Sequence, residues 1–462
     1  MKASYPQGKT IFRITDFGAV GDGVANATAA LRQALEACHR HGNGVVIVPA
    51  GTFFIEPLYL KSNVHLHLEK GATLLGSPRA EDYPEWSSRR IHLEGAPYNA
   101  RALFYAEDEE NITLSGEGTI HGQGNAFYDG SDPSRKWWPV PDRAARPGRM
   151  LLFALCRNVE IRSLTFQEAP AWTFWMFGCE DVRFHGVTIR TNPNAINTDG
   201  IDIDACRNVR IAHCDISTGD DAIVLRNIWR IFNPQSTETS RTGLGFGLRP
   251  CEHVTVENCR LQSWCNAIRI SYLRDEAIRN ATFRNLEIVD SWRGIICQIP
   301  VPMQTPEGQT GHPVGRGPLV ENIHFSNITV EARQPLWFYV APEAILRRVG
   351  NVVFENVTFR GSHHSLIRGN EAVPGDQILL RNVSFTLGEP ETTTLHNAFH
   401  DQETATHLHL GDLRGISLQN VHFGGDLPAH AGELPVIRLE RVASAELAQV
   451  TNGTRFPLRR EA

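Results

Sequence analysis

Two short acidic segments hold the residues of this chain whose types and spacing could do acid–base chemistry. They are residues 197–203 (NTDGIDI) and 217–223 (STGDDAI), which supply Asp199, Asp220 and Asp221. Apolar residues alternate with period two in both segments, as in a strand with one buried face. If the strands stack as neighbouring parallel rungs about 4.8 Å apart, Asp199 is level with Asp221, and Asp220 lies one residue to the side. Carboxylates held so close repel one another, which favours a functional site over the alternative of three solvated loop aspartates.

Aligning the inward apolar pairs of five successive segments predicts columns of polar and aromatic residues beside these acids. The pairs are Phe174/Met176, Ile201/Ile203, Ile223/Leu225, Ile268/Ile270 and Ile295/Cys297. The first column lies two residues before each pair and contains Trp172, Asp199, Asp221, Asn266 and Arg293. The second column lies between the members of each pair and contains Trp175, Asp202, Val224, Arg269 and Ile296. The third column directly follows each pair and contains Phe177, Asp204, Arg226, Ser271 and Gln298. Tryptophan faces beside carboxylates suit sugar rings, although an outward aromatic ladder can also simply stiffen a sheet.

A strand pattern repeats from about residue 110 onward and predicts the fold. Its first apolar residues are Ile112, Val159, Val182, Val209, Val254, Ala281, Ile323, Val352, Ile378 and Ile416. The fifth positions are Ser163, Gly186 and His213, then Asn258, Asn285, Asn327, Asn356, Asn382 and Asn420. Such an asparagine series suits a sharp inward turn, at which each amide hydrogen-bonds the next rung. We therefore predict an all-β protein, a right-handed single-stranded parallel β-helix.

The N-terminal part is predicted to cap this solenoid. Residues 11–25 are typical of a strand and a glycine-rich turn, and Asn26 can cap a helix over about 27–39. The histidines of strand 64–68 (VHLHL) alternate outward, which favours surface positions over metal ligation. We expect one domain over 1–462, with about 1–50 as the cap region and about 430–462 as terminal rungs and tail.

Three long insertions interrupt the repeat. Long loops on a rigid scaffold usually build a binding cleft. The insertions are residues 127–149 with Trp137 and Trp138, residues 226–251 with Trp229 and Arg230, and residues 299–318 with His312 and Arg316.

Composition restricts the compartment and the partners. The net charge is −6 and the isoelectric point about 6.3, so no basic surface indicates nucleic acid. No run of 18 apolar residues predicts a membrane span. The nine cysteines form no CxxC motif, and Cys214 and Cys259 lie in strand patterns where a buried free thiol is expected. With no secretory signal visible, we predict a reducing, cytoplasmic location; a secreted chain shortened by its leader would look the same.

The two acidic motifs together, on a β-helix with this N-terminal strand–turn–helix, resemble glycoside hydrolase family 28, the polygalacturonases and rhamnogalacturonan hydrolases. The resemblance runs from about residue 12 to about residue 330. It implies that Asp220 is the general acid, that Asp199 and Asp221 activate water, and that the anomeric carbon is inverted. It also implies a pectin-like or other acidic plant or microbial oligo- or polysaccharide as the substrate, with no cofactor and no metal. Inverting enzymes separate acid and base by roughly 6.5–9.5 Å to admit the water.

The chain departs from the pattern of that family at two motifs. The usual Gly-His-Gly is replaced by residues 265–267 (CNA), and the usual Arg-Ile-Lys by residues 296–298 (ICQ). In polygalacturonases these motifs order the acid and grip a galacturonate carboxylate. Here Asn266 can instead hydrogen-bond Asp221 or a sugar, while Arg269 can bind an anionic group or pair with an aspartate. The full set of candidate substrate-binding residues is Asn197, Asp202, Arg226, Asn266, Arg269, Arg293, Gln298, Trp172 and Trp175.

Other functional classes stay open on the sequence alone. In a polysaccharide lyase, Asp199, Asp202, Asp220 and Asp221 could hold calcium and Arg269 could abstract the proton. A non-catalytic glycan-binding β-helix would bind a glycan without cleaving it, and a sugar epimerase is a further alternative. The oligomeric state is not predicted.

Overall fold

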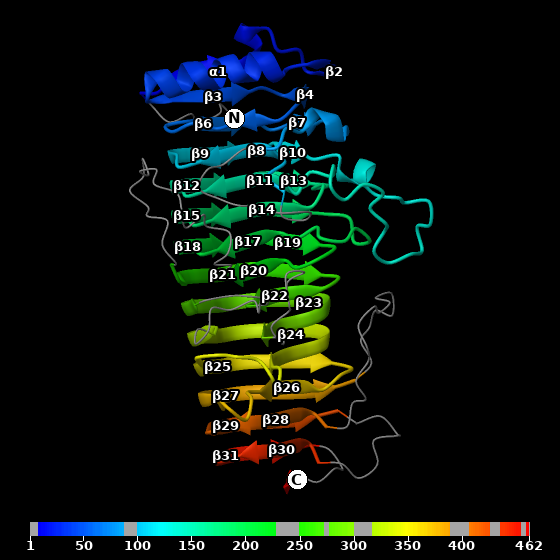
Figure 1. Ribbon diagram of the computed structural model, residues 1–462, viewed down its shortest axis with the longest axis vertical. Helices are drawn as coiled ribbons and strands as arrows, with labels where there is room; N and C mark the ends of the chain where they lie inside the picture. The colour runs from blue at the N-terminus through cyan, green and yellow to red at the C-terminus, as the bar shows by residue number, and fades with distance from the viewer. Residues whose placement is uncertain are drawn as a thin grey trace. The chain divides into compact units, whose positions relative to one another are not determined.

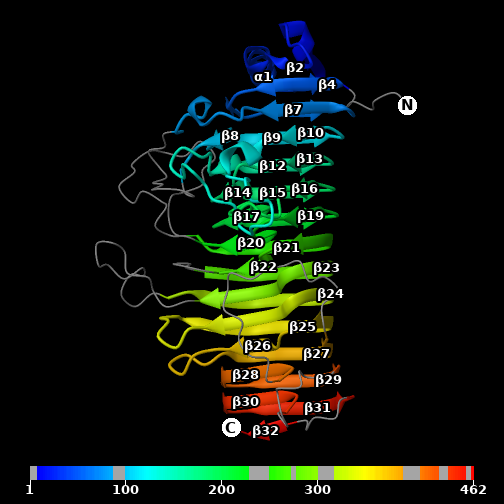
Figure 2. The same cartoon turned by 90° about the vertical axis from the view of Figure 1, so that its right-hand side faces the viewer.

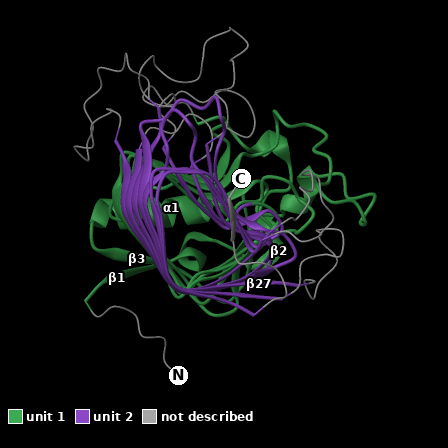
Figure 3. Cartoon of the chain, turned by 90° about the horizontal axis from the view of Figure 1, so that it is seen from below, with its two compact units in different colours: residues 1–220, 230–247 green, residues 221–229, 248–462 purple. Residues whose placement is uncertain are grey.

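The computed structural model describes residues 8–86, 99–227, 249–271, 277–299, 317–388, 406–425, 435–453 and 459–461, the last stretch without side chains. Two compact units are distinguished, and the chain passes from the first to the second between Asp220 and Asp221 (Figure 3). The expectation of one single domain stays a prediction. The loop candidates Trp229, Arg230, His312 and Arg316 lie outside the described residues.

Three series of parallel strands build unit 1 (Figures 1 and 2). One series contains β5 (Leu58–Tyr59), β8 (Ala102–Glu107), β11 (Arg149–Ala154), β14 (Trp172–Phe177) and β17 (Ile201–Asp204). A second contains β1 (Thr10–Arg13), β3 (Gly44–Val48), β6 (His65–Leu68), β9 (Glu110–Gly116), β12 (Arg157–Arg162), β15 (Glu180–His185) and β18 (Arg207–Ala212). The third contains β2 (Asp22–Asn26), β4 (Gly51–Ile55), β7 (Ala72–Gly76), β10 (Thr119–His121), β13 (Thr165–Gln167), β16 (Thr188–Arg190) and β19 (Asp215–Thr218).

Unit 2 is also built from series of parallel strands, several of which are long. Its first series contains β20 (Ile223–Arg226), β22 (Asn266–Ile270), β26 (Ser365–Arg368), β28 (Leu408–Leu413), β30 (Ile437–Val442) and β32 (Arg459–Glu461). Its second contains β21 (Cys251–Ser263), β25 (Arg348–Gly361), β27 (Asp376–Leu387), β29 (Ile416–Gly424) and β31 (Ala445–Asn452). The long strands β23 (Ala277–Ile299) and β24 (Leu319–Val340) take part in both series.

The rungs pair in the predicted register within each unit. In unit 1 the predicted strand starts are direct partners on successive strands, namely Ile112, Val159, Val182 and Val209. In unit 2 the same holds for Val254, Ala281, Ile323, Val352, Ile378 and Ile416. The predicted fold class, a right-handed parallel β-helix with an N-terminal helix, is confirmed.

The predicted asparagine ladder is present in unit 2. The Asn285 amide donates to Asn258 Oδ1 at 3.0 Å, and that of Asn327 donates to Asn285 Oδ1 at 3.1 Å. The series continues through Asn356, Asn382 and Asn420. All six residues have φ between 53° and 56°, a left-handed conformation that asparagine tolerates better than most residues. The side chains are exposed, so the ladder orders a surface corner of each coil.

The N-terminal helix is shifted slightly from its predicted position. Helix α1 spans Thr28–His41, and its N-cap is Ala27 rather than the predicted Asn26. Asn26 still contributes, because its Oδ1 accepts the Thr28 N–H at 2.9 Å. The apolar side of the helix packs on β1 and β3. No helix among the described residues is both long and apolar enough to cross a lipid bilayer.

Two expectations about single side chains have different outcomes. All nine cysteines are free and buried, as predicted for Cys214 and Cys259.

The surface position predicted for the histidines of residues 64–68 is wrong for His65, which is buried with its Nε2 2.7 Å from Ser115 Oγ. Burial lowers the pKa of His65 to about 3, so this ring is neutral at ordinary pH.

Candidate active site

Asp202 and Asp204 of unit 1 lie in the predicted columns. Strands β14 and β17 pair so that Trp175 is the partner of Asp202 and Phe177 the partner of Asp204. Both aspartates are completely buried, and Asp199, two residues before β17, is 5% exposed. Period-two alternation thus fills the strand interior with Ile201 and Ile203 and leaves the carboxylates of Asp202 and Asp204 on its other face.

Asp220 is held by the segment that carries Asn197. Its Oδ2 accepts the backbone N–H of Asn197 at 2.8 Å, and Thr218 Oγ1 donates to the Asp220 carbonyl at 2.6 Å. Gly219 makes this approach possible, because a Cβ there would lie 2.2 Å from the carbonyl oxygen of Asn192. Asn197 itself adopts φ 60°. The structure therefore gives this asparagine a backbone role toward Asp220; its predicted contact with substrate stays a prediction.

A buried arginine from the insertion 127–149 supports that segment. Arg146 donates from Nη1 to the Tyr128 hydroxyl at 2.8 Å and from Nη2 to Asn197 Oδ1 at 3.3 Å. The Tyr128 hydroxyl in turn lies 2.8 Å from the Ile196 carbonyl, to which it donates. Burial raises the pKa of Tyr128, so its hydroxyl stays a donor. Sequence reasoning missed Arg146 and Tyr128, whose only signal was the richness of this insertion in arginine.

The two predicted sugar-stacking tryptophans pack around Arg149. The guanidinium carbon of Arg149 lies 4.0 Å from the ring centre of Trp172 and 4.2 Å from that of Trp175. Trp175 Nε1 donates to Asp204 Oδ2 at 3.3 Å. Trp172 is 3% exposed, and Trp175 is completely buried. These rings thus orient charged groups beside the acids by cation–π and hydrogen-bond contact; their contact with a sugar stays a prediction.

In unit 2, two side chains of β22 donate hydrogen bonds to Asp221. Asn266 Nδ2 donates to Asp221 Oδ1, and Arg269 Nη1 donates to Asp221 Oδ2 at 2.7 Å. Asp221 is 2% exposed and Asn266 is 1% exposed. Strands β20 and β22 pair with Val224 opposite Arg269, as the alignment predicts. The sequence left two alternatives for Arg269, binding an anionic group or pairing with an aspartate. In the structure, Arg269 pairs with Asp221.

The remaining predicted polar residues of unit 2 occupy neighbouring positions. Arg293 is the strand partner of Asn266, and its Nε donates to Gln334 Oε1 at 3.0 Å. Burial lowers the pKa of Arg293. Arg226 ends β20 and is 5% exposed, while Gln298 is half-buried near the end of β23. The sequence did not predict the contact of Gln334 with Arg293, because Gln334 belongs to no recognisable motif.

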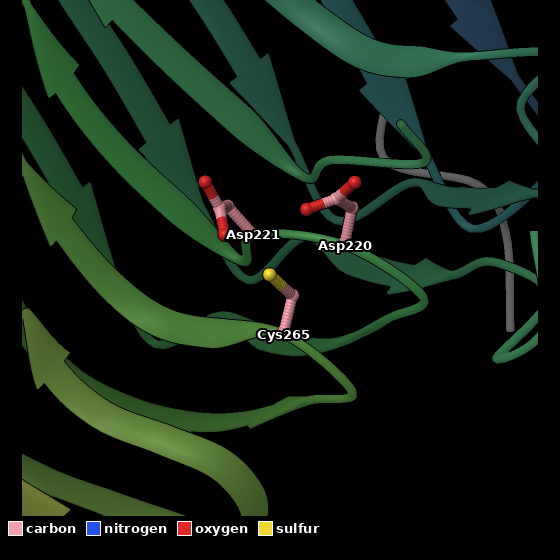
Figure 4. A group of neighbouring side chains, drawn as sticks. All are labelled: Asp220, Asp221 and Cys265. Atoms are coloured by element: carbon pink, nitrogen blue, oxygen red, sulfur yellow. The ribbon is translucent and has the colours of Figure 1, made fainter. Parts of the chain in front are cut away.

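One thiol lies close to Asp221. A carboxylate oxygen of Asp221 and Sγ of Cys265 are within 4.8 Å of each other (Figure 4, which also draws Asp220, the preceding residue in the chain). The Cys265 N–H donates to Ser263 Oγ at 2.9 Å. Calcium prefers six to eight oxygen ligands, so a thiol beside Asp221 does not favour the calcium site of a lyase. The expectation that no metal is needed stays a prediction.

The chain is similar to known proteins. The family model for glycosyl hydrolases family 28 matches residues 38–373. The chain is 29% identical over 294 residues to a probable polygalacturonase of Arabidopsis thaliana, covering 59% of each protein. It spans between 40% and 60% of the length of the first four curated relatives it matches.

Two solved structures share the fold. A hyperthermoactive exopolygalacturonase from Thermotoga maritima has a TM-score of 0.65 at 20% identity, covering 91% of this chain and 93% of that one. The endo-xylogalacturonan hydrolase from Aspergillus tubingensis has a TM-score of 0.53 at 16% identity, covering 98% and 99%. The family model spans well over half of the chain and includes all three candidate catalytic aspartates, so the chain belongs to glycosyl hydrolase family 28.

Proposed function

We propose that this chain is an inverting glycoside hydrolase that cleaves a pectin-like or other acidic oligo- or polysaccharide. The observation that carries the proposal is the match to family 28 over a region containing Asp199, Asp220 and Asp221. Relatives named polygalacturonase support a uronic-acid polymer as the substrate class. In unit 2, the buried Arg226 and the half-buried Arg293 are the candidates to bind its carboxylates.

In the proposed reaction, Asp220 donates its proton to the glycosidic oxygen while a water oxygen attacks the anomeric carbon. The bond between that carbon and the glycosidic oxygen breaks, and the proton released by the water passes to Asp199 or Asp221. The Asn197 N–H on Oδ2 supports the role of Asp220, because it fixes the orientation of the carboxyl group. The donors on Asp221 likewise support a fixed, charged acceptor for the proton of the water.

Incubation with a panel of galacturonides, rhamnogalacturonan fragments and other acidic glycans tests this function. We expect new reducing ends without ultraviolet absorption, and a rate unchanged by a metal chelator. An ultraviolet-absorbing product that disappears with the chelator would identify a lyase instead. Binding of a glycan without any cleavage would indicate a non-catalytic β-helix.

A further inference from the structure

Both carboxylate oxygens of Asp221 accept hydrogen bonds from side chains of the next rung of unit 2. Asn266 donates to Oδ1, and Arg269 donates to Oδ2 at 2.7 Å. The Asp221 side chain is 3% exposed and that of Arg269 is 16% exposed. This pair therefore differs from the exposed ion pairs of the sheet edges, which solvent screens and which contribute little.

The charges of this pair depend on each other. Burial by itself lowers the pKa of Arg269, but the Asp221 carboxylate outweighs that effect and the pKa is raised. The guanidinium thus stays charged next to Asp221. A buried ion pair is costly to desolvate, and the attraction between its charges offsets that cost only where the geometry is good and further hydrogen bonds are made, such as the one that Asn266 donates here. The neighbouring Arg293 donates to Gln334 Oε1 at 3.0 Å.

We infer that Arg269 is a positioning residue that acts in catalysis through Asp221, and that it does not bind the anionic substrate. The inference rests on the proposed function, in which Asp221 orients and deprotonates water. One donor on each oxygen fixes the orientation of the Asp221 carboxylate and prevents its rotation. Asn266 and Arg269 thereby order the Asp221 carboxylate in a chain whose residues 265–267 are CNA.

A kinetic double-mutant cycle tests this role. On any glycan that the unaltered protein hydrolyses, Arg269→Ala should lower kcat by ~10–100-fold, the cost of a misplaced catalytic group. KM should change by less than about threefold, because the substrate contacts are kept. In an Asp221→Asn background, the same change should cost less than about threefold more, since its partner is already neutral.

Two further measurements separate positioning from general structural damage. Added guanidinium should restore part of the kcat of Arg269→Ala, whereas urea, which has the same shape without the charge, should not. The matched control is Arg279→Ala, which removes another arginine–carboxylate contact between rungs of unit 2, with Glu252 at 2.8 Å, and should leave kcat unchanged. If Arg269→Ala does not fold, Arg269→Lys keeps the charge and should lose kcat with KM unchanged.

Different outcomes would overturn this role and the proposed function. If Arg269→Ala raises KM for anionic substrates and leaves kcat unchanged, Arg269 binds the substrate. The same conclusion follows if the losses of Arg269→Ala and Asp221→Asn multiply in the double variant. Failure of guanidinium to restore a folded Arg269→Ala would also contradict the role. If the unaltered protein hydrolyses no glycan, the proposed function falls, and the role of Arg269 falls with it.

Discussion

Replacing Asp220 by asparagine is expected to lower kcat by ~10²–10⁴-fold, the typical contribution of general-acid catalysis. The amide cannot supply the proton that the departing glycosidic oxygen needs. It can still accept the Asn197 N–H through its carbonyl oxygen, so the local structure and substrate binding should be kept. KM should therefore change little, and steady-state kinetics on one glycan would measure both parameters.

A substrate with a very good leaving group distinguishes the acid from the bases. Such a group departs without protonation, so it should partly restore turnover by Asp220→Asn. It should not restore Asp199→Asn or Asp221→Asn, because the attacking water still needs a proton acceptor. Equal rescue of all three variants would contradict the assignment of Asp220 as the acid.

Gly219→Ala is expected to reduce kcat by about 100-fold or more, without removing any reactive group. The new Cβ would lie 2.2 Å from the Asn192 carbonyl oxygen and 2.6 Å from Thr198 Oγ1, so this part of the chain must shift. A displacement near 1 Å costs a catalytic group about 100-fold in rate. Overpacking should also lower the free energy of unfolding by about 1–3 kcal/mol.

Gly415→Ala is the matched control for this change, because a Cβ at Gly415 meets no atom within 4 Å. Its kcat and denaturation midpoint should equal those of the unaltered protein. Kinetics and denaturant unfolding of both variants check the prediction. A fully active Gly219→Ala would contradict the prediction that a Cβ at this position displaces Asp220.

The sequence predicts the repeat because each rung obeys the same local rules. Inward apolar pairs at period two define the register of β14 with β17, and of β20 with β22, without reference to any distant residue. The asparagine corners are predictable for the same reason, since a left-handed φ is a local requirement. These features repeat along the chain, so each rung of the sequence pattern supports the interpretation of the rung before it.

Contacts between distant segments are not predictable in this way. Arg149 lies between Trp172 and Trp175, although its own strand pattern gives no sign of a buried guanidinium. Arg146 reaches Asn197 from an insertion whose path no periodicity defines. His65 alternates outward as predicted yet is buried. In each case tertiary packing, rather than the local pattern, determines what the side chain contacts.

The anomeric configuration of the first product tests the central proposal most directly. Proton NMR in the first minutes of hydrolysis, before mutarotation, resolves the signal of the new anomeric proton. Direct displacement by water predicts a product with the configuration opposite to that of the cleaved bond. A retained anomer would require a covalent intermediate and carboxyl groups only about 5–5.5 Å apart, and would contradict water activation by Asp199 and Asp221.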